Sequence, residues 1–376
     1  MLRAVAEVNL AAIERNTERL LRRVGHHTRV CAVVKADGYG HGAIQSARAA
    51  LRGGATALAV ATVAEAVELR QTGFDVPILV LGAISDEELP PAVGAGTELT
   101  VWDPNFVARL RAVAAAAPAP IGVHVKLDTG LGRLGTRELD EALATVQAVL
   151  RSGPELRLAG VMTHFATADG DLDFVARQLH EFTPFVAEAR ALATTDITVH
   201  AANSAAILRV PDSRFDMVRA GIALYGADPM NNDPADHGLE PALALRSYVA
   251  AVKPIAAGQS TGYGRRFIAE RDGQIATLPI GYGDGVVRAL ANNCEVLIGG
   301  RRYPLCGMVS MDNVTIDIGS GSPVALGQSA TLIGADGDER QTAEDLARRV
   351  GTISYELLCW ISKRVPRVYH YDGRPA

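Results

Sequence analysis

With 376 residues, the chain is longer than a single ordinary core usually supports, so we expect two domains, one of which could be a barrel of about 250 residues. Hydrophobic residues make up 48% of the sequence and aromatic residues only 5%, which predicts a globular protein with an aliphatic interior. The net charge of −5 provides no basic field for a nucleic acid, and we exclude that class of partner.

The start of the chain and its cysteines predict a cytoplasmic location. Arg3 and Glu7 interrupt the first residues before a signal-peptide core could form, and no apolar run is long enough to span a membrane. The four cysteines show no metal-ligand spacing, so we expect no metal site. Because Cys31 and Cys359 lie in apolar runs, we interpret the cysteines as reduced core residues.

After a helical pattern that begins at Asn9 and stops at Gly25, short apolar runs alternate regularly with amphipathic stretches. Helix boundaries are readable between the runs: Thr62 to Glu65 is a capping box, and Asp103-Pro104 starts a helix over 106–117. The eight candidate strands are 29–34, 56–61, 77–81, 98–101, 121–127, 158–163, 197–201 and 216–220.

Eight strand–helix units in about 200 residues favour an α/β fold of the (β/α)₈ TIM-barrel type over a doubly wound sheet. The alternative is that the weak fourth strand has been counted in error. The pattern changes after about residue 235, beyond a loop at 231–234, and a mainly β C-terminal domain follows. Its expected strands and two short helices are 242–255, 274–280, 294–298, 309–318, 330–333, 342–350 and 353–361.

We therefore predict a barrel domain over 1–240 and a mainly β domain over 241–376, with the first few residues as candidates for pairing with the second domain.

Lys35 is the first candidate for catalysis. It ends an apolar strand and precedes the glycine-punctuated stretch Ala36-Asp37-Gly38-Tyr39-Gly40-His41-Gly42. Partial desolvation favours the neutral amine, which can attack an aldehyde to form a Schiff base. Only four of the 37 basic residues are lysines, and an arginine in place of Lys35 could not form an imine.

Other polar residues fall at the carboxyl ends of the predicted strands, where barrel enzymes place their active sites. Barrels often bind a phosphate with the loops after strands seven and eight, so the Ser204 hydroxyl and the N–H groups of Gly221 and Ile222 become candidates for that role. A phosphate site together with a Schiff-base lysine suggests pyridoxal phosphate. The remaining polar residues at strand ends are Lys126, Asp128, His164, Asn203 and Arg219.

These motifs together resemble the alanine racemases, which are fold-type III pyridoxal-phosphate enzymes, over nearly the whole chain. The resemblance begins with Ala32-Val33-Val34-Lys35 and the glycine-rich stretch after it. It continues at Lys126 to Gly135, His164, His200 to Ser204, Arg214 to Gly221, Gly262-Tyr263-Gly264, Ile280 to Gly285, Met311-Asp312 and Gly351 to Glu356.

The resemblance implies a homodimer in which Lys35 holds pyridoxal 5'-phosphate and serves as one catalytic base. Tyr263, contributed across the dimer interface, is implied as the second base, and Arg219 as the partner of the pyridine nitrogen. The resemblance also implies that Lys126 is carbamylated. The further residues implied at the cofactor are Tyr39, His164, Asn203, Ser204, Gly221, Ile222 and Tyr355, and those at the substrate are Arg133, Met311 and Tyr282.

The implied reaction interconverts L-alanine and D-alanine and supplies D-alanine for peptidoglycan. One alternative is a fold-type III racemase of serine, lysine or arginine, which the side chains at the entrance of the site would distinguish. A decarboxylase of the same fold fits less well because those enzymes lack the signature around Tyr263. A protein that binds pyridoxal phosphate without turnover consists of the barrel alone, so the C-terminal domain speaks against it.

Overall fold

The computed structural model describes residues 2–376. The chain divides into two compact units whose segments interleave along the sequence. The barrel unit consists of Glu14–Gly38 and Ala43–Leu224, and the β unit consists of the described residues up to Ile13 together with Tyr39–Gly42 and Tyr225–Ala376. We describe each unit by itself.

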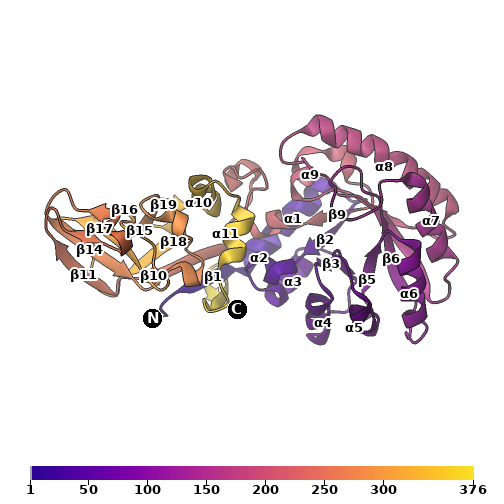
Figure 1. Ribbon diagram of the computed structural model, residues 1–376, viewed down its shortest axis with the longest axis horizontal. Helices are drawn as coiled ribbons and strands as arrows, with labels where there is room; N and C mark the ends of the chain where they lie inside the picture. The colour runs from indigo at the N-terminus through magenta and orange to yellow at the C-terminus, as the bar shows by residue number, and fades with distance from the viewer. Residues whose placement is uncertain (1) are drawn as a thin grey trace. The chain divides into compact units, whose positions relative to one another are not determined.

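The barrel unit is a closed ring of parallel strands, as predicted (Figure 1). Its strands are β2 (Arg29–Val33), β3 (Ala57–Val60), β4 (Ile78–Val80), β5 (Glu98–Val101), β6 (Ile121–Lys126), β7 (Leu156–Met162), β8 (Thr198–His200) and β9 (Met217–Ala220). The weak fourth strand is present as β5. The ring closes where β2 pairs with β9, with Ala32 opposite Ala220 in the register. Residues at the carboxyl ends of β2 and β9 are therefore neighbours.

Helices connect the strands and surround the ring (Figure 1). Thr62 and Glu65 form the predicted capping box of α4, and the Asp103 side chain caps α6 by accepting from Asn105 and Phe106. This helix begins at Pro104, directly after the predicted cap, and ends at Ala114, earlier than the predicted residue 117. The helices are α1 (Leu10–Val24), α3 (Ala43–Arg52), α4 (Val63–Gln71), α5 (Leu89–Gly94), α6 (Pro104–Ala114), α7 (Leu139–Leu150), α8 (Leu172–Leu192) and α9 (Ser204–Arg209).

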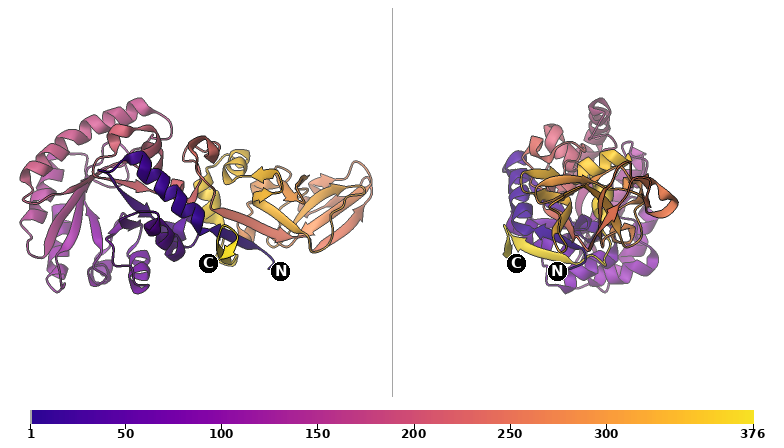
Figure 2. Two further views of the ribbon diagram at one scale, coloured as in Figure 1. Left: turned by 180° about the vertical axis from the view of Figure 1, so that it is seen from behind. Right: turned by 90° about the vertical axis from the view of Figure 1, so that its left-hand side faces the viewer.

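The β unit contains one large sheet and two small ones. The large sheet follows the order β16-β15-β18-β10-β1-β20-β21, with β19 attached to β18, and the small sheets are β11-β14-β17 and β12-β13. Within the large sheet, β1 (Val5–Asn9) is antiparallel to β10 (Leu243–Tyr248) and parallel to β20 (Arg367–Tyr371). The indigo N-terminal strand and the yellow C-terminal segment accordingly run together in Figure 2.

The other strands of the β unit are β11 (Ala251–Ile255), β12 (Ser260–Thr261), β13 (Phe267–Ile268), β14 (Gly273–Leu278), β15 (Glu295–Ile298), β16 (Arg301–Pro304), β17 (Val314–Gly319), β18 (Ser329–Asp336), β19 (Glu339–Gln341) and β21 (Arg374–Pro375). The two predicted helices are α10 (Ala343–Val350) and α11 (Ser354–Trp360). The predicted run 242–255 is two strands rather than one, and the run 309–318 begins as a strand only at Val314.

Two further observations concern the predicted location. Among residues 2–376, no helix combines the length and the apolar character needed to cross a membrane. All four cysteines are free thiols, but Cys359 is exposed on α11, so its predicted core position is wrong. The apolar neighbours that suggested a core position, Leu357 and Leu358, occupy the buried face of that helix instead.

Candidate active site

Lys35 follows β2, separated from it by Val34 alone, and opens a turn with an unusual backbone. Ala36, Asp37 and Tyr39 have positive φ values of 52°, 52° and 51°, a region that residues with side chains rarely adopt. Gly38 lies in the same region, with a φ of 62°. Such strain costs on the order of 1–3 kcal/mol per residue and persists only where surrounding contacts hold it, which is typical of functional sites.

Two carboxylates hold this turn in the barrel unit. Glu65 accepts from the N–H of Ala36 at 2.6 Å with one oxygen and from the N–H of Ala61 at 2.8 Å with the other. Asp37 accepts from the N–H of Ala43 at 2.9 Å. The glutamate of the α4 capping box, Glu65, thereby also fixes the chain next to Lys35.

Arg219, on the strand beside β2, is buried among neutral acceptors. Its guanidinium donates to Nδ1 of His200 at 2.8 Å and to Nδ1 of His164 at 3.0 Å. Three more of its hydrogen bonds go to the carbonyl oxygens of Thr163, His200 and Ala201. Burial lowers the pKa of Arg219 to about 10, so the side chain is still a cation at neutral pH and can only donate.

The two imidazole contacts fix the proton positions of both rings. Since Arg219 can only donate, the Nδ1 atoms of His164 and His200 must accept, and each ring in its neutral form carries its proton on Nε2. Burial, followed by the charge of Arg219, lowers the pKa of both histidines well below its ordinary value. Both rings are therefore neutral at physiological pH.

The loops after β8 and β9 meet at Ser204. Its hydroxyl oxygen accepts from the N–H of Gly221 at 2.9 Å and from that of Ala223 at 3.3 Å. Asn203 precedes Ser204 as the N-cap of α9, where its side chain accepts from the N–H of Ala206 at 3.0 Å. The Ser204 hydroxyl thus lies against the backbone of Gly221 and Ala223, in the loops where the sequence predicts a phosphate site.

Lys126 ends β6 and is buried. Burial, with the nearby cations Arg219 and Arg133, lowers the pKa of Lys126 to about 8, and Asp128 opposes this shift. The Asp128 carboxylate accepts from the N–H groups of three consecutive loop residues, Gly130, Leu131 and Gly132. Asp128 therefore shapes the loop that presents Arg133, whose side chain is exposed.

Tyr39 follows Lys35 in the sequence but belongs to the β unit, where it lies near Tyr355, a second residue implied at the cofactor. The ring centroids of Tyr39 and Tyr355 lie 6.1 Å apart, and those of Tyr39 and Tyr225 lie 5.2 Å apart. Burial raises the pKa of Tyr39 well above its ordinary value, so the phenol is protonated and can donate a hydrogen bond.

Tyr263, Tyr282 and Met311 lie on adjoining loops of the β unit and are exposed within the single chain by 74%, 42% and 52%. The N–H of Tyr282 donates to the carbonyl of Ser310 at 2.9 Å, and that of Gly283 donates to the carbonyl of Met311 at 2.9 Å. These loops are held by Asp284, which is fully buried and accepts from both Arg3 and Arg364.

Comparisons with known proteins agree with this organisation. Residues 8–229 match the model of the alanine racemase N-terminal domain, and residues 242–369 match that of the C-terminal domain. The chain belongs to the alanine racemase family. Its reaction is the interconversion of L-alanine and D-alanine, and it is an isomerase.

Individual alanine racemases are similar over almost the whole length. The alanine racemase of Geobacillus stearothermophilus is 41% identical over 372 residues, which cover 98% of this chain and 94% of that protein. The crystal structure of alanine racemase from a D-cycloserine-producing Streptomyces lavendulae gives a TM-score of 0.93 at 35% identity, covering 98% of this chain and 97% of the other. Alanine racemase from E. faecalis gives 0.91 at 37% identity, with 98% of each chain covered.

Two residues that hold the candidate site residues in place, Glu65 and Asp284, were not identified from the sequence. Glu65 was visible as part of a capping box, but its contact with Ala36 depends on the fold. Asp284 lies inside the family motif Gly283-Asp284-Gly285, and this position between two glycines was the only signal that could have drawn attention to it.

Proposed function

We propose that this chain racemises alanine with pyridoxal 5'-phosphate and two bases, Lys35 and Tyr263. The observation that carries the proposal is the meeting of four groups at the carboxyl ends of adjacent strands in the barrel unit. Lys35 follows β2, Arg219 lies on β9, and the Ser204 hydroxyl binds the N–H of Gly221 just after β9. An amine for the Schiff base, a partner for the pyridine nitrogen and a set of phosphate donors are the groups with which proteins hold this cofactor.

The donor chemistry of these residues fits the cofactor. The residues that we propose for the phosphate are Ser204, Gly221, Ile222, Tyr39 and Tyr355. Arg219 would donate to the pyridine nitrogen, and Lys35 would hold the cofactor covalently. When bound, the cofactor supplies an electron sink for the electron pair left at Cα after a proton is removed. The membership of the chain in the alanine racemase family supports this assignment.

Lys35 and Tyr263 exchange the substrate proton on opposite faces of Cα in this proposal. One residue removes the proton as a general base, and the other delivers a proton to the other face as a general acid. Since His164 carries its proton on Nε2, it offers a donor between Arg219 and Tyr263. Asn203 supports the site indirectly by capping α9, the helix that begins at Ser204.

Arg133 and the N–H of Met311 would bind the substrate carboxylate, and Tyr282 would narrow the entrance for a small side chain. Lys126 is the candidate for carbamylation. With a pKa lowered to about 8, a useful fraction of its amine is neutral near pH 7 and can react with carbon dioxide. The carbamate would be an anion close to the cations Arg219 and Arg133, and it would steady Arg133.

We infer that the active form is a homodimer, because Tyr263, Tyr282 and Met311 form a set of exposed apolar side chains that a partner chain would cover. We further propose that the enzyme works in the cytoplasm and supplies D-alanine for peptidoglycan. A racemase of serine, lysine or arginine is not supported, because the relatives and solved structures described above are alanine racemases.

Borohydride reduction followed by peptide mapping tests the cofactor assignment. Purified protein should be yellow, and reduction should attach the cofactor to Lys35. The Lys35→Ala variant should stay folded but lose both the colour and the adduct, whereas Lys253→Ala, which removes an exposed lysine, should keep both. A reducible adduct on another lysine of the Lys35→Ala variant would contradict the assignment.

A further inference from the structure

A chain of polar side chains crosses the inside of the barrel unit from Arg219 to Glu98. Arg219 donates to Nδ1 of His200 at 2.8 Å, and Nε2 of His200 lies 2.8 Å from Nδ1 of His124. Nε2 of His124 lies 3.0 Å from one oxygen of Glu98, and the other oxygen accepts from Arg157 at 3.0 Å. Barrel interiors are usually filled with branched apolar side chains, so a continuous polar path needs an explanation.

Two glycines leave the space for this path. His124 on β6 and His200 on β8 are not on adjacent strands, and they meet across Gly160 of the intervening β7. A Cβ at Gly160 would lie 2.6 Å from Nδ1 of His124, and a Cβ at Gly122 would lie 2.8 Å from an oxygen of Glu98. Neither glycine has a positive φ. The absence of a side chain at Gly122 and Gly160 therefore leaves space for the polar path, and neither glycine is needed for an unusual backbone conformation.

The hydrogen bonds of the path can run in only one direction while both rings are neutral. Nδ1 of His200 accepts from Arg219, so Nε2 of His200 carries the proton and donates to His124. Nδ1 of His124 then accepts, and its Nε2 proton is donated to Glu98. Each ring is both a donor and an acceptor, and the carboxylate at the end accepts only. Burial would raise the pKa of Glu98, but the His124 bond and Arg157 hold it below its ordinary value.

We propose that Glu98 and His124 are positioning residues for Arg219, because they fix the His200 tautomer that accepts from the guanidinium. The proposal rests on the function proposed above, in which Arg219 contacts the cofactor ring. If His200 carried its proton on Nδ1, this atom would face an N–H of Arg219 and the contact would become repulsive. Arg219 would then lose one of the contacts that hold it in place, and misplacement of a catalytic group by about 1 Å can cost about a hundredfold in rate.

Glu98→Gln is the most informative substitution, because it alters the shape very little but replaces one acceptor oxygen by a donor NH₂ group. Arg157 can only donate, so it attracts the single amide oxygen and turns the NH₂ group toward His124. His124 must then accept at Nε2 and carry its proton on Nδ1, which reverses the path. Removing Arg157 as well, in Glu98→Gln/Arg157→Leu, frees the amide oxygen to face His124 and restores the original direction.

Glu155→Gln is the matched control. Glu155 immediately precedes β7, is 22% exposed compared with 18% for Glu98, and also pairs with an arginine, Arg111. No hydrogen bond or ion pair joins its side chain to His124 or His200 in residues 2–376. The same carboxylate-to-amide change is therefore made in a similar setting outside the path.

The test measures the tautomers of His124 and His200 by ¹⁵N NMR of the histidine-labelled holoenzyme, assigned with single histidine variants, together with kcat and KM. In the wild type and Glu155→Gln, both rings should be neutral with the proton on Nε2. Glu98→Gln should shift the proton of both rings toward Nδ1 and lower kcat about tenfold or more with a smaller change in KM. The double variant should recover the Nε2 tautomers and most of kcat.

Three results would overturn the positioning role: Nδ1 protonation or an imidazolium on either ring in the wild type, unchanged tautomers in Glu98→Gln, or reversed tautomers with unchanged kcat. A fold defect is recognised because it would not be relieved by the second substitution. The ¹⁵N NMR measurement of the tautomers does not depend on catalytic turnover. A wild type that failed to carry the cofactor on Lys35 would therefore refute the proposed function and leave this readout intact.

Discussion

Arg219 is a buried cation whose proposed role is to set the electronic character of the site. All of its contacts within the barrel unit are with neutral acceptors, and no carboxylate is hydrogen-bonded to it among residues 2–376. A guanidinium facing the pyridine nitrogen would leave that nitrogen unprotonated, because both groups cannot donate to each other. Arg219 would thereby keep the ring a weaker electron sink, which would favour return of the proton to Cα over transamination.

The Arg219→Glu variant should therefore racemise alanine more slowly, by at least about a hundredfold, and release more pyruvate per turnover. A carboxylate favours a protonated pyridine nitrogen and a stronger electron sink. D-alanine can be measured by chiral chromatography and pyruvate by a coupled dehydrogenase. Arg219→Lys, which keeps the positive charge, should not increase pyruvate. An unchanged ratio of pyruvate to D-alanine in Arg219→Glu would contradict the electronic role.

At the scale of elements, the turn after β2 and the first turn of α4 depend on one carboxylate. Glu65 accepts from the N–H groups of Ala36, Ala61 and Thr62, and the first of these belongs to the left-handed stretch beside Lys35. A hydrogen-bonded acceptor in this place offsets the strain of the turn. The cap of α4 and the geometry of the turn beside Lys35 are thereby linked.

Glu65→Ala should lower the free energy of unfolding by about 1–3 kcal/mol, because it leaves backbone donors without their acceptor. It should also reduce kcat by more than the loss of folded protein explains, since the turn at Lys35 loses its support. Urea titration and steady-state kinetics measure the two effects. Glu68→Ala, an exposed position on the same helix, is the control and should change neither quantity. Equal behaviour of the two variants would refute this role of Glu65.

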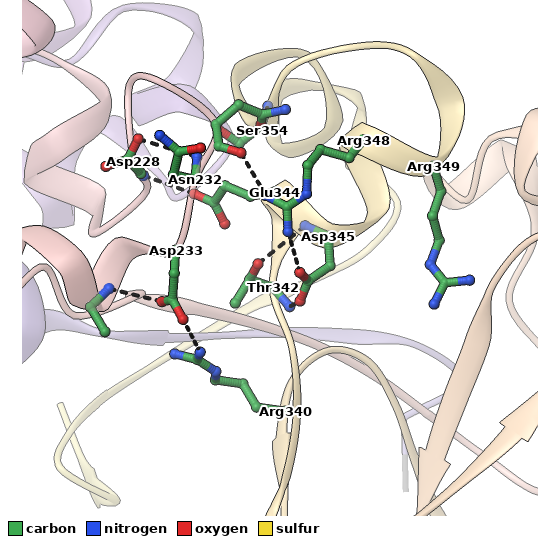
Figure 3. Close-up of polar contacts among 12 residues, drawn as sticks. Asp228, Asn232, Asp233, Arg340, Thr342, Glu344, Asp345, Arg348, Arg349 and Ser354 are labelled. Atoms are coloured by element: carbon green, nitrogen blue, oxygen red, sulfur yellow. Dashed lines mark hydrogen bonds and ion pairs between the residues drawn. The ribbon is translucent and has the colours of Figure 1, made fainter.

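Two buried carboxylates, Glu344 on α10 and Asp228 in the loop after Tyr225, are neighbours in the β unit (Figure 3). Glu344 is buried and accepts from the N–H of Asp228 at 2.8 Å, and Asp228 itself is fully buried. Burial raises the pKa of Glu344 above 4.5, and the nearby charge of Asp228 adds to this shift. His237 lies 3.5 Å from Asp228.

An acid whose pKa is higher in the folded state binds more protons when folded than when unfolded. Between the two pKa values, stability therefore falls as the pH rises. The Glu344→Gln variant keeps the acceptor oxygen and removes the charge, so at pH 7 it should be more stable than the wild type by on the order of 1 kcal/mol. Below about pH 4 the difference should vanish, because Glu344 is protonated in both states. A variant less stable than the wild type at pH 7 in urea titration would contradict this account.

The elements that the sequence predicts best are those with a local signal. Apolar runs and caps located all eight barrel strands and the start of α4, because burial and capping act on neighbouring residues. The pairing of the first few residues with the second domain was expected, and β1 pairs with β10 and β20; its bounds were not predicted, since these partners are more than two hundred residues away and only long-range pairing makes it a strand. The path from Arg219 to Glu98 was missed for the same reason, because His124 and His200 look like ordinary buried histidines in the sequence.

In the candidate site, too, some residues have a signal in the sequence and others depend on contacts that only the fold creates. Family motifs named Lys35, Arg219 and Ser204 individually, and the structure brings them to the ends of neighbouring strands in the barrel unit. Their predicted roles remain predictions. No pattern in the sequence could reveal that Glu65 supports the backbone after Lys35, since this contact connects two loops that the fold alone brings together.

In the proposed assembly, each active site is built from two chains. Tyr263, Tyr282 and Met311 are exposed in one chain, although two of them are assigned to the substrate and one to proton transfer. In the proposed homodimer, the β unit of each subunit supplies these residues to the barrel of its partner. A variant without Lys35 and a variant without Tyr263 should then restore activity when they are combined in one dimer.

Complementation between Lys35→Ala and Tyr263→Phe tests this claim most directly. Each homodimer should be nearly inactive, because either substitution removes proton transfer on one face of Cα. After dissociation and mixing in equal amounts, half of the dimers should be mixed, and one of the two sites in each should have both bases. The mixture should recover up to about a quarter of wild-type activity. If subunit exchange is verified and activity stays at the level of the separate variants, the two bases belong to the same chain and the account is contradicted.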